Sequence, residues 1–264
     1  MNDDLWEAVA IRYATVERRL SENFIFCATP EGEARMDYFV WLLTNGNRAI
    51  LVDTGFNEQA ARERKRNFLA CPIRSLETLD VTAADVEDVV ITHAHYDHAG
   101  NLGLLPRARF HLQEREMQFA TGAPMRHRVL RHSYCVDDVC SLVRLVYADR
   151  VVFHDGDYDL APGVSVHLVG GHTHGLQIVR VRTSRGYVVL ASDASHYLEN
   201  LRARSPFPIV SDVAEMLRGY ERIEALADSP DHIVPGHDPL VMQQYRRLPL
   251  RDGVQAVSLT EPIG

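Results

Sequence analysis

Short runs of apolar side chains divide the chain, and most of these runs predict β-strands. Residues 6–16 form one such run, and residues 36–53 predict a hairpin in which the turn "NGN" joins "MDYFVWLLT" to "RAILVD". The later runs also predict strands: "DVVIT", "ARFHL", "RVVFHD", "GVSVHLVGG", "LQIVRVRT", "GYVVLASD" and "DHIVPGH". We expect "TSRG" to be a hairpin turn before "GYVVLASD".

Longer segments between these runs predict helices. One covers roughly residues 57–70, and "TAADVEDVV" offers Thr82 as a helix N-cap with Asp85 three residues later. Residues 121–148 predict an irregular, largely helical insertion, and a further helix is expected from Ser211, as N-cap, to about Ala227. Strands and helices in this order favour an α/β fold of two packed sheets with helices outside. Without repeats or an evident linker, residues 1–264 predict a single domain.

Composition supports a folded body and narrows its partners. Of the 264 residues, 46% are hydrophobic and 24% charged, as in ordinary globular proteins. The net charge of −8 and the single short basic run "RERKR", which we interpret as a solvated helix face, argue against nucleic acid as a partner. No apolar stretch approaches the roughly 18 residues of a membrane span, and no signal peptide is evident, so we expect a cytoplasmic protein with no membrane partner.

The four cysteines predict no metal or disulfide framework. Cys27, Cys71, Cys135 and Cys140 contain no C-x-x-C pair. We interpret them as reduced structural thiols, and a zinc-thiolate site is the second interpretation.

The segment "VVITHAHYDHAGN" concentrates metal-ligand side chains directly after an apolar strand. His93, His95, Asp97 and His98 offer imidazole nitrogens and a carboxylate, the ligand set of zinc and similar borderline metals. Alternate side chains of an extended segment share one face, so His93 and His95 can reach one ion. Asp97 and His98 follow a change of chain direction and can reach a second.

Later strand ends offer further ligands. His172 in "VGGHTHG", Asp193 in "VLASDAS" and His237 in "IVPGHDP" each follow an apolar strand. Strand ends at one rim of packed sheets face a shared crevice, so we expect these residues to join the first cluster. His174 competes with His172; we prefer His172, which follows the strand directly, and expect His174 to support the ligands from behind.

Together these residues resemble the metallo-β-lactamase superfamily. Five motifs over roughly residues 36–240 occur in the family's order: "LVDTG", "THAHYDH", "GGHT", "SDAS" and "PGHD". The resemblance implies a four-layer αβ/βα sandwich with a dinuclear metal site at one edge of the two sheets. It also implies a first metal on His93, His95 and His172, a second on Asp97, His98 and His237, and a bridging Asp193. Asp53 would then orient a histidine ligand; the alternative is an ordinary turn residue before Gly55.

The resemblance implies hydrolysis by two divalent ions, for which we expect Zn²⁺, although manganese, iron or cobalt fit the same ligands. Superfamily members with a di-iron redox site carry a glutamate where this chain has His95. A metal-bridging hydroxide would attack an ester-like carbonyl, and Asp97 would shuttle the proton. The segments "HAHYDHAGN" and "SDAS" look most like the quorum-quenching N-acyl-homoserine lactonases, so the expected reaction is lactone opening.

Two features bear on the substrate. Those lactonases place a tyrosine three residues after the bridging aspartate, whereas this chain has His196 there and Tyr197 next. Either residue is a candidate to contact the substrate carbonyl. The segment "MRHRVLRHSY" contains Arg126 and Arg131, which predict recognition of an anionic, carboxylated lactone. The alternative for both arginines is a solvated helix face.

Other functions compete with lactone opening. Within the superfamily, a thioester hydrolase like glyoxalase II or a β-lactamase-like amide hydrolase would use the same centre. A metal-binding protein without catalysis is a third possibility. Relatives of this kind are often dimers, so a homodimer is expected.

Overall fold

The computed structural model describes residues 4–26, 31–46 and 48–263, and two β-sheets form its centre. Within these residues one sheet has nine strands, in the order β13-β14-β1-β2-β3-β5-β6-β7 with β4 beside β1. Its strands are β1 (Glu7–Arg19), β2 (Glu33–Asn45), β3 (Arg48–Val52), β4 (Asn67–Phe68), β5 (Val86–Val90), β6 (Arg109–Gln113), β7 (Val151–His154), β13 (Tyr245–Arg247) and β14 (Gln255–Pro262). The second sheet has the order β12-β11-β10-β9-β8, with β8 (Tyr158–Ala161), β9 (Val164–Leu168), β10 (Gln177–Thr183), β11 (Gly186–Ser192) and β12 (Ile233–Pro235).

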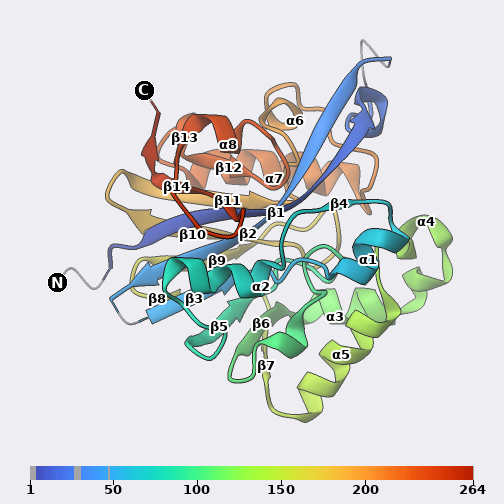
Figure 1. Ribbon diagram of the computed structural model, residues 1–264. Helices are drawn as coiled ribbons and strands as arrows, with labels where there is room; N and C mark the ends of the chain where they lie inside the picture. The colour runs from blue at the N-terminus through green and yellow to red at the C-terminus, as the bar shows by residue number, and fades with distance from the viewer. Residues whose placement is uncertain (1–3, 27–30, 47, 264) are drawn as a thin grey trace.

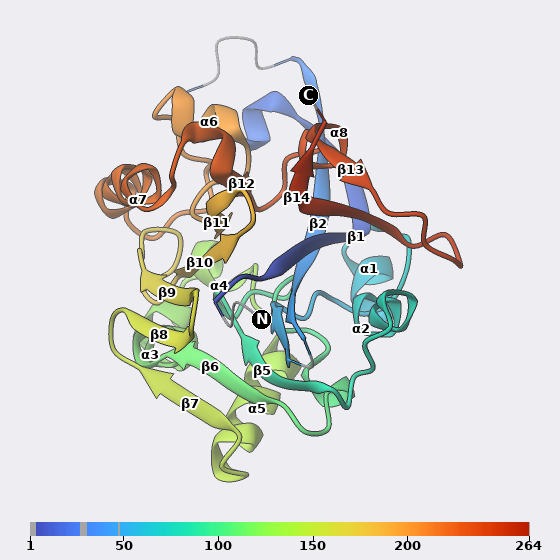
Figure 2. The same cartoon turned by 90° about the vertical axis from the view of Figure 1, so that its left-hand side faces the viewer.

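Helices cover the outer faces of both sheets. The α-helices are α1 (Glu58–Glu63), α2 (Pro72–Ser75), α3 (Glu114–Thr121), α4 (Arg128–Arg131), α5 (Val136–Tyr147), α6 (Leu198–Arg202), α7 (Val213–Leu226) and α8 (Val241–Gln244). Short 3-10 turns are η1 (Leu20–Glu22), η2 (Leu76–Leu79), η3 (Leu102–Leu104), η4 (Ala123–Arg126) and η5 (Pro230–His232). α1 and α2 flank the large sheet (Figure 1), and α7 lies outside the smaller one (Figure 2).

Three apolar clusters hold these layers together. The cluster between the sheets contains Trp6, Trp41 and Leu190, all 2% exposed or less. A second packs the outer face of the large sheet against its helices, and a third packs α7 against the smaller sheet. The predicted arrangement of two packed sheets with helices outside is therefore confirmed.

The strand connections bring several strand ends to one edge. Both predicted hairpins form: β2 pairs antiparallel with β3, and β10 with β11. β3 and β5 are parallel neighbours in one sheet, and β11 and β12 in the other. Because parallel strands end on the same side of their sheet, polar residues that follow these strands meet at one edge of the molecule.

The structure corrects two predicted helices. The helix predicted for residues 57–70 ends at Glu63, because Lys65 adopts a left-handed conformation with a φ of 55° and the chain turns into β4. Thr82 caps no helix: the carboxylate of Asp85 accepts hydrogen bonds from the backbone N–H and the hydroxyl of Thr82 within a turn before β5. A local side-chain bond thus replaces the expected helical turn.

Two further differences concern residues beyond 210. The N-cap of α7 is Asp212, which accepts a hydrogen bond from the N–H of Glu215, whereas the hydroxyl of Ser211 donates to the carbonyl of Gly171. The last strand of the large sheet, β14, was not predicted, although "VQAVSLT" is largely buried against β1.

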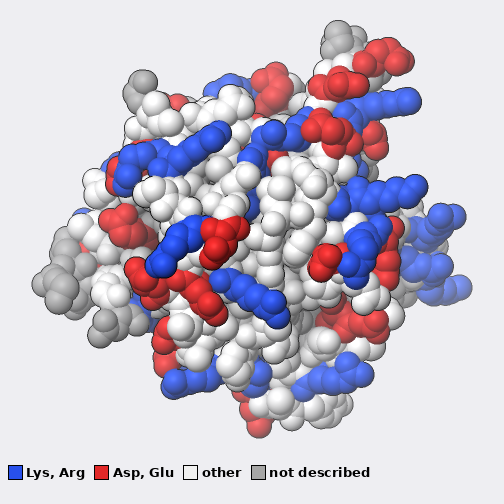
Figure 3. Space-filling model, viewed as in Figure 1, with Lys and Arg blue, Asp and Glu red and all other residues white. Residues whose placement is uncertain are grey.

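The structure also bears on the predictions about cysteines, membrane spans and surface charge. Cys71, Cys135 and Cys140 are free thiols, and Cys27 lies outside the described residues. No described helix is long and apolar enough to cross a membrane. Positive and negative side chains are interspersed on the face shown in Figure 3, with positive ones gathered at the edge near α1 and α4.

Candidate metal centre

A cluster of histidine and aspartate side chains lies where five strands end. Asp53 follows β3, His93 follows β5 and His172 follows β9, while Asp193 and His237 follow β11 and β12. All five side chains are buried, with exposed fractions of 3% or less. The cluster therefore draws on both sheets and lies at the edge where their strands end.

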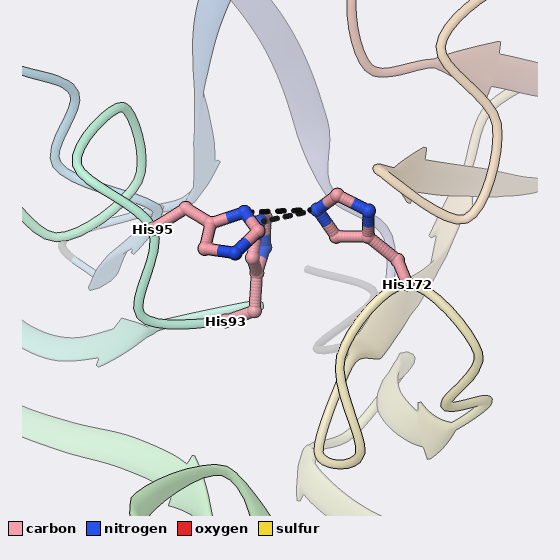
Figure 4. A group of neighbouring side chains, drawn as sticks. All are labelled: His93, His95 and His172. Carbon is pink, nitrogen blue, oxygen red and sulfur yellow. Dashed lines mark hydrogen bonds between the residues drawn. The ribbon is translucent and has the colours of Figure 1, made fainter. Parts of the chain in front are cut away.

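His93, His95 and His172 form the first group of possible ligands. Nε2 of His172 lies 3.2 Å from Nε2 of His93 and 2.9 Å from Nδ1 of His95, and the three rings converge as Figure 4 shows. Two neutral imidazoles can share one hydrogen between them, but a third nitrogen at the same point then lacks a partner. Their ligand atoms all lie within 4.8 Å of one another, close enough to hold one cation.

Asp97, His98 and His237 form a second group, and Asp193 lies between the two groups. Asp193 Oδ1 is 3.2 Å from Nε2 of His98 and 3.0 Å from Nε2 of His237. Its other oxygen, Oδ2, faces the first group and lies 3.4 Å from Nε2 of His172. Asp97 Oδ2 lies 3.8 Å from His98 and 3.9 Å from His237. One carboxylate thus faces both groups.

Several inward-facing atoms are left without hydrogen-bond partners. Among the described residues, Nε2 of His98, Nε2 of His237 and Oδ1 of Asp193 are buried, and the short distances between them do not have the alignment of a hydrogen bond. Leaving such atoms unpaired is costly unless something else occupies the space between them. Nitrogen and carboxylate donors that converge in this way fit a borderline divalent cation.

The outward-facing nitrogens of these histidines have oxygen partners. Nδ1 of His172 donates to the carbonyl of Ile209 over 2.5 Å, and Nδ1 of His237 donates to the carbonyl of Asp37 over 2.8 Å. Nδ1 of His98 lies 2.7 Å from Oδ2 of Asp53. A donor role for the outer nitrogen assigns the tautomer whose lone pair faces the centre.

Electrostatics keep the first group neutral and Asp193 ionised. Burial lowers the pKa of His93, His95 and His172, so their imidazoles stay unprotonated and able to ligate. Burial alone would raise the pKa of Asp193, but His237 and His98 hold it well below its usual value. For His98, burial lowers the pKa, but the nearby Asp193 and Asp53 outweigh it and raise the pKa.

Asp53 is positioned by an unusual backbone conformation and by Thr92. Its φ of 63° is left-handed, a region that aspartate tolerates better than most residues. The carboxylate accepts hydrogen bonds from the N–H and hydroxyl of Thr92, and that hydroxyl also lies 2.9 Å from the hydroxyl of Ser192 at the end of β11. Asp53 therefore lies behind His98 as expected; its effect on metal binding stays a prediction.

His174 does not take the role assigned to it. Its side chain is exposed, and the ring packs against Phe119 with centroids 4.3 Å apart. After the two glycines of "VGGHTHG" the chain directs His172 inward and His174 outward. Thr173, between them, is instead buried.

His196 and Tyr197 are separated by the structure. Nε2 of His196 lies 2.9 Å from Oδ2 of Asp193, and its buried ring stacks on Phe207 with 5° between the planes. The hydroxyl of Tyr197 donates to the carbonyl of Arg35 over 3.0 Å. Of the two candidates, His196 is the one that lines the cleft beside the ligands.

The two predicted substrate-binding arginines do not line this cleft. Arg126 and Arg131 are exposed, and Nη1 of Arg131 donates to the carbonyls of Met125 and Arg126, both over 3.3 Å. Arg126 ends the 3-10 turn η4 and Arg131 ends the short helix α4, and both are exposed, so the solvated-face interpretation describes them. From the same segment, His132 and Ser133 do line the cleft.

The cleft contains positive residues that the sequence analysis missed. It has a volume of about 60 Å³; its lining beyond the predicted residues consists of Arg18, Met36, Tyr38, Arg64, Arg66, Tyr96, His132, Ser133 and Ile209. Cavities of about 510 and 560 Å³ lie elsewhere, beside α3 and α4, and contain none of the clustered ligands. We place the candidate site at the smaller cleft, because the converging ligand atoms are there.

Glu116 is a second omission. Its buried carboxylate accepts hydrogen bonds from the N–H of Ala94, the N–H of Gly175 and the hydroxyl of Tyr134, at 2.9, 3.2 and 2.9 Å. Ala94 lies between two possible ligands, and Gly175 belongs to the loop of His172. Glu116 therefore fixes two ligand-bearing loops relative to each other, and nothing in "QEREMQF" distinguishes it from its exposed neighbours.

Known proteins resemble this chain in sequence and in fold. The model of the metallo-beta-lactamase superfamily matches residues 36–237. An N-acyl homoserine lactonase of Bacillus cereus is 27% identical over 194 residues, which cover 68% of this chain and 72% of the relative. One from a Bacillus species is 30% identical over 189 residues, 65% of this chain and 70% of the relative. The crystal structure of a quorum-quenching N-acyl homoserine lactone lactonase, 24% identical, superposes with a TM-score of 0.78 over 93% of this chain and 98% of its own, which shows the shared fold.

Proposed function

Because the chain belongs to the metallo-β-lactamase superfamily, we propose that it is a metal-dependent hydrolase that opens a lactone, a cyclic ester. The observation that carries the proposal is the pair of ligand groups that share Asp193. The N-acyl homoserine lactonases among its relatives support a lactone as the substrate. An N-acyl-homoserine lactone, which would make the enzyme quorum quenching, and a carboxylated lactone are the two candidates.

Two divalent cations, which we expect to be Zn²⁺, would occupy the centre. His93, His95 and His172 would hold one, and Asp97, His98 and His237 the other, with Asp193 between them. When bound, such ions supply hydroxide at neutral pH and polarise the carbonyl oxygen of an ester. These ligand assignments combine the converging atoms with the family resemblance.

The chain's own residues would orient the substrate and move the proton. Asp97 lines the cleft, where its carboxylate can accept a proton and return it to the ring oxygen, which becomes the hydroxyl group of the product when its bond to the acyl carbon breaks. His196 also lines the cleft, and we assign it the contact with the substrate carbonyl. Tyr197 is not assigned that contact, because its hydroxyl already donates to Arg35.

We also propose that residues 1–264 form a single domain. Within it, residues 121–148 would form an insertion that covers the bound substrate. His132 and Ser133 of this segment line the cleft, which supports the proposal. The cytoplasmic location and the homodimer stay predictions.

Metal analysis combined with a substrate screen tests the proposal. Purified, metal-loaded protein would be offered lactones, thioesters and β-lactams in a pH-indicator assay, and we expect about two metal ions per chain and acid release from lactones. His93→Ala should abolish turnover, whereas His127→Ala, an exposed histidine outside the cleft, should not. Turnover restricted to thioesters or β-lactams, or metal binding without any turnover, would refute lactone hydrolysis.

A further inference from the structure

Three arginines line the cleft beside the candidate metal centre without a carboxylate partner. Arg18 comes from β1, Arg64 caps the C-terminus of α1, and Arg66 precedes β4. Within the described part of the chain, no aspartate or glutamate oxygen lies within 4.0 Å of these guanidinium groups. Arg62, from the same "RERKR" run, does pair with Glu58 at 2.9 Å. In a protein with a net charge of −8, three unpaired cations at one cleft are unexpected.

Arg64 and Arg66 are held at the cleft by Tyr96. The guanidinium carbon of Arg64 lies 3.8 Å from the centre of the Tyr96 ring, and its nitrogens donate to the carbonyls of His132 and Tyr134 over 3.0 and 3.2 Å. Nε of Arg66 donates to the hydroxyl of Tyr96 over 3.1 Å. Neutral acceptors position both cations, so among the described residues neither guanidinium is engaged in a direct ion pair.

Tyr96 also connects these arginines to the possible ligands. It lies between His95 and Asp97 in the sequence, and its hydroxyl is 3.3 Å from the hydroxyl of Tyr38. The ring of Tyr38 packs against His237 with centroids 5.1 Å apart. The arginines are therefore fixed to the wall of the same cleft that receives the reacting group.

Arg18 completes the positive side of the cleft from another element. Its Nη1 approaches the sulfur of Met36 at 3.5 Å, which is a weak acceptor. Because no hydrogen bond or ring contact joins Arg18 to Tyr96 within the described residues, we expect a substitution there to leave the packing of the "HAHYDH" segment intact. This makes Arg18 a useful second test position.

We propose that Arg18, Arg64 and Arg66 bind a carboxylate of the substrate other than the ester that is hydrolysed. This inference rests on the proposed function and narrows it to carboxylated lactones. The guanidinium group matches a carboxylate with two parallel hydrogen bonds, and all three arginines line the cleft that also contains His95, Asp97, His172 and Asp193. The alternative is that the arginines bind no substrate and only balance the charge of Asp97 and Asp193.

The first test compares two five-membered lactones that differ only by a ring carboxylate. We expect the carboxylated lactone to have the higher kcat/KM, and the preference for it to fall about 10- to 100-fold in Arg66→Lys and in Arg18→Ala, through KM. The lysine of Arg66→Lys retains the positive charge but cannot make the two parallel hydrogen bonds of a guanidinium group. Arg62→Ala, in the same run but paired with Glu58 on the surface, should keep the preference.

The second test measures binding without catalysis. Isothermal titration of the metal-loaded protein with glutarate, a compact dicarboxylate, should give binding that weakens about tenfold or more in Arg66→Lys and Arg18→Ala but not in Arg62→Ala. Circular dichroism and metal content would confirm that each variant is folded and loaded.

The two readouts separate this inference from the proposed function. If no lactone is hydrolysed but glutarate binding still depends on Arg66 and Arg18, the lactonase proposal fails and the anion site stands. If both lactones are hydrolysed equally well and glutarate binds the Arg66→Lys and Arg18→Ala variants as tightly as the unaltered protein, the anion site is refuted and the lactonase proposal stands. Loss of metal in Arg66→Lys and Arg18→Ala, without a change in preference, would identify the arginines as charge balance for the ligands.

Discussion

Nδ1 of His98 donates a hydrogen bond to Oδ2 of Asp53 over 2.7 Å, with both side chains buried. The bond directs Nε2 of His98 toward Asp193. In Asp53→Asn the amide is a weaker acceptor and can present its NH₂ group instead, so the histidine loses its fixed orientation. We expect metal affinity to fall about 10- to 100-fold, measured by competition with a chelator.

A matched control for this variant is available at the surface. Asp85→Asn makes the same chemical change where the carboxylate accepts hydrogen bonds from Thr82 in an exposed turn. It should bind metal as the unaltered protein does. Equal metal affinity in the two variants would argue that Asp53 is the ordinary turn residue considered as the alternative.

Glu116→Gln tests whether one carboxylate joins the two ligand-bearing loops. The amide replaces an acceptor with a donor opposite the N–H groups of Ala94 and Gly175, which leaves buried donors unpaired. We expect a loss of about 1–3 kcal/mol in the free energy of unfolding, measured by urea denaturation of the metal-free protein. Glu114→Gln, exposed on the same helix, should change it by less than about 0.5 kcal/mol.

Tyr197→Phe should mainly lower stability, whereas His196→Ala should mainly lower kcat/KM. Removing the hydroxyl of Tyr197 takes away its bond to the carbonyl of Arg35, so about 1 kcal/mol of stability should be lost with kcat/KM nearly unchanged. His196→Ala removes a side chain that lines the cleft, and kcat/KM should fall at least tenfold. Thermal unfolding and steady-state kinetics provide the two measurements. A large fall in kcat/KM in Tyr197→Phe would indicate that Tyr197, and not His196, contacts the substrate carbonyl.

His154 should make the fold sensitive to acid. Burial, together with the neighbouring His111, lowers the pKa of His154 from 6.5 to about 4. Between these values the unfolded chain binds a proton that the folded chain does not, so stability is lost as the pH falls from about 6.5 to 4. His154→Gln should flatten the fall of the melting temperature across this window, whereas the exposed His127→Gln should not. Parallel curves for His154→Gln and the unaltered protein would contradict the assignment.

The strands and the ligand cluster could be predicted because each leaves a local pattern. An apolar run followed at once by His93, His172, Asp193 or His237 marks a strand end, and parallel strands bring such ends together. Arg64 and Arg66 left no such pattern. Their run is interpreted as one helix face unless the left-handed conformation of Lys65 is known, and a single lysine does not predict it.

Contacts between distant segments account for the other omissions. Glu116 is distinguished from Glu114 only by the loops that come to lie against it. Tyr197 was a reasonable candidate from its position near Asp193, yet its hydroxyl meets Arg35, which is 162 residues away in the sequence. Such partners depend on how the sheets pack, which no local pattern records.

The left-handed turn at Lys65 has a consequence for how this protein could change its substrate. The turn lies between α1 and β4, outside every motif that supplies a possible metal ligand. Lengthening or shortening it by one residue would replace Arg64 and Arg66 at the cleft with other side chains while the strand ends that carry the ligands stayed as they are. In the proposed anion site, the arginines that select charge thus lie outside the motifs that supply the ligands, and selection can alter them without rebuilding the centre.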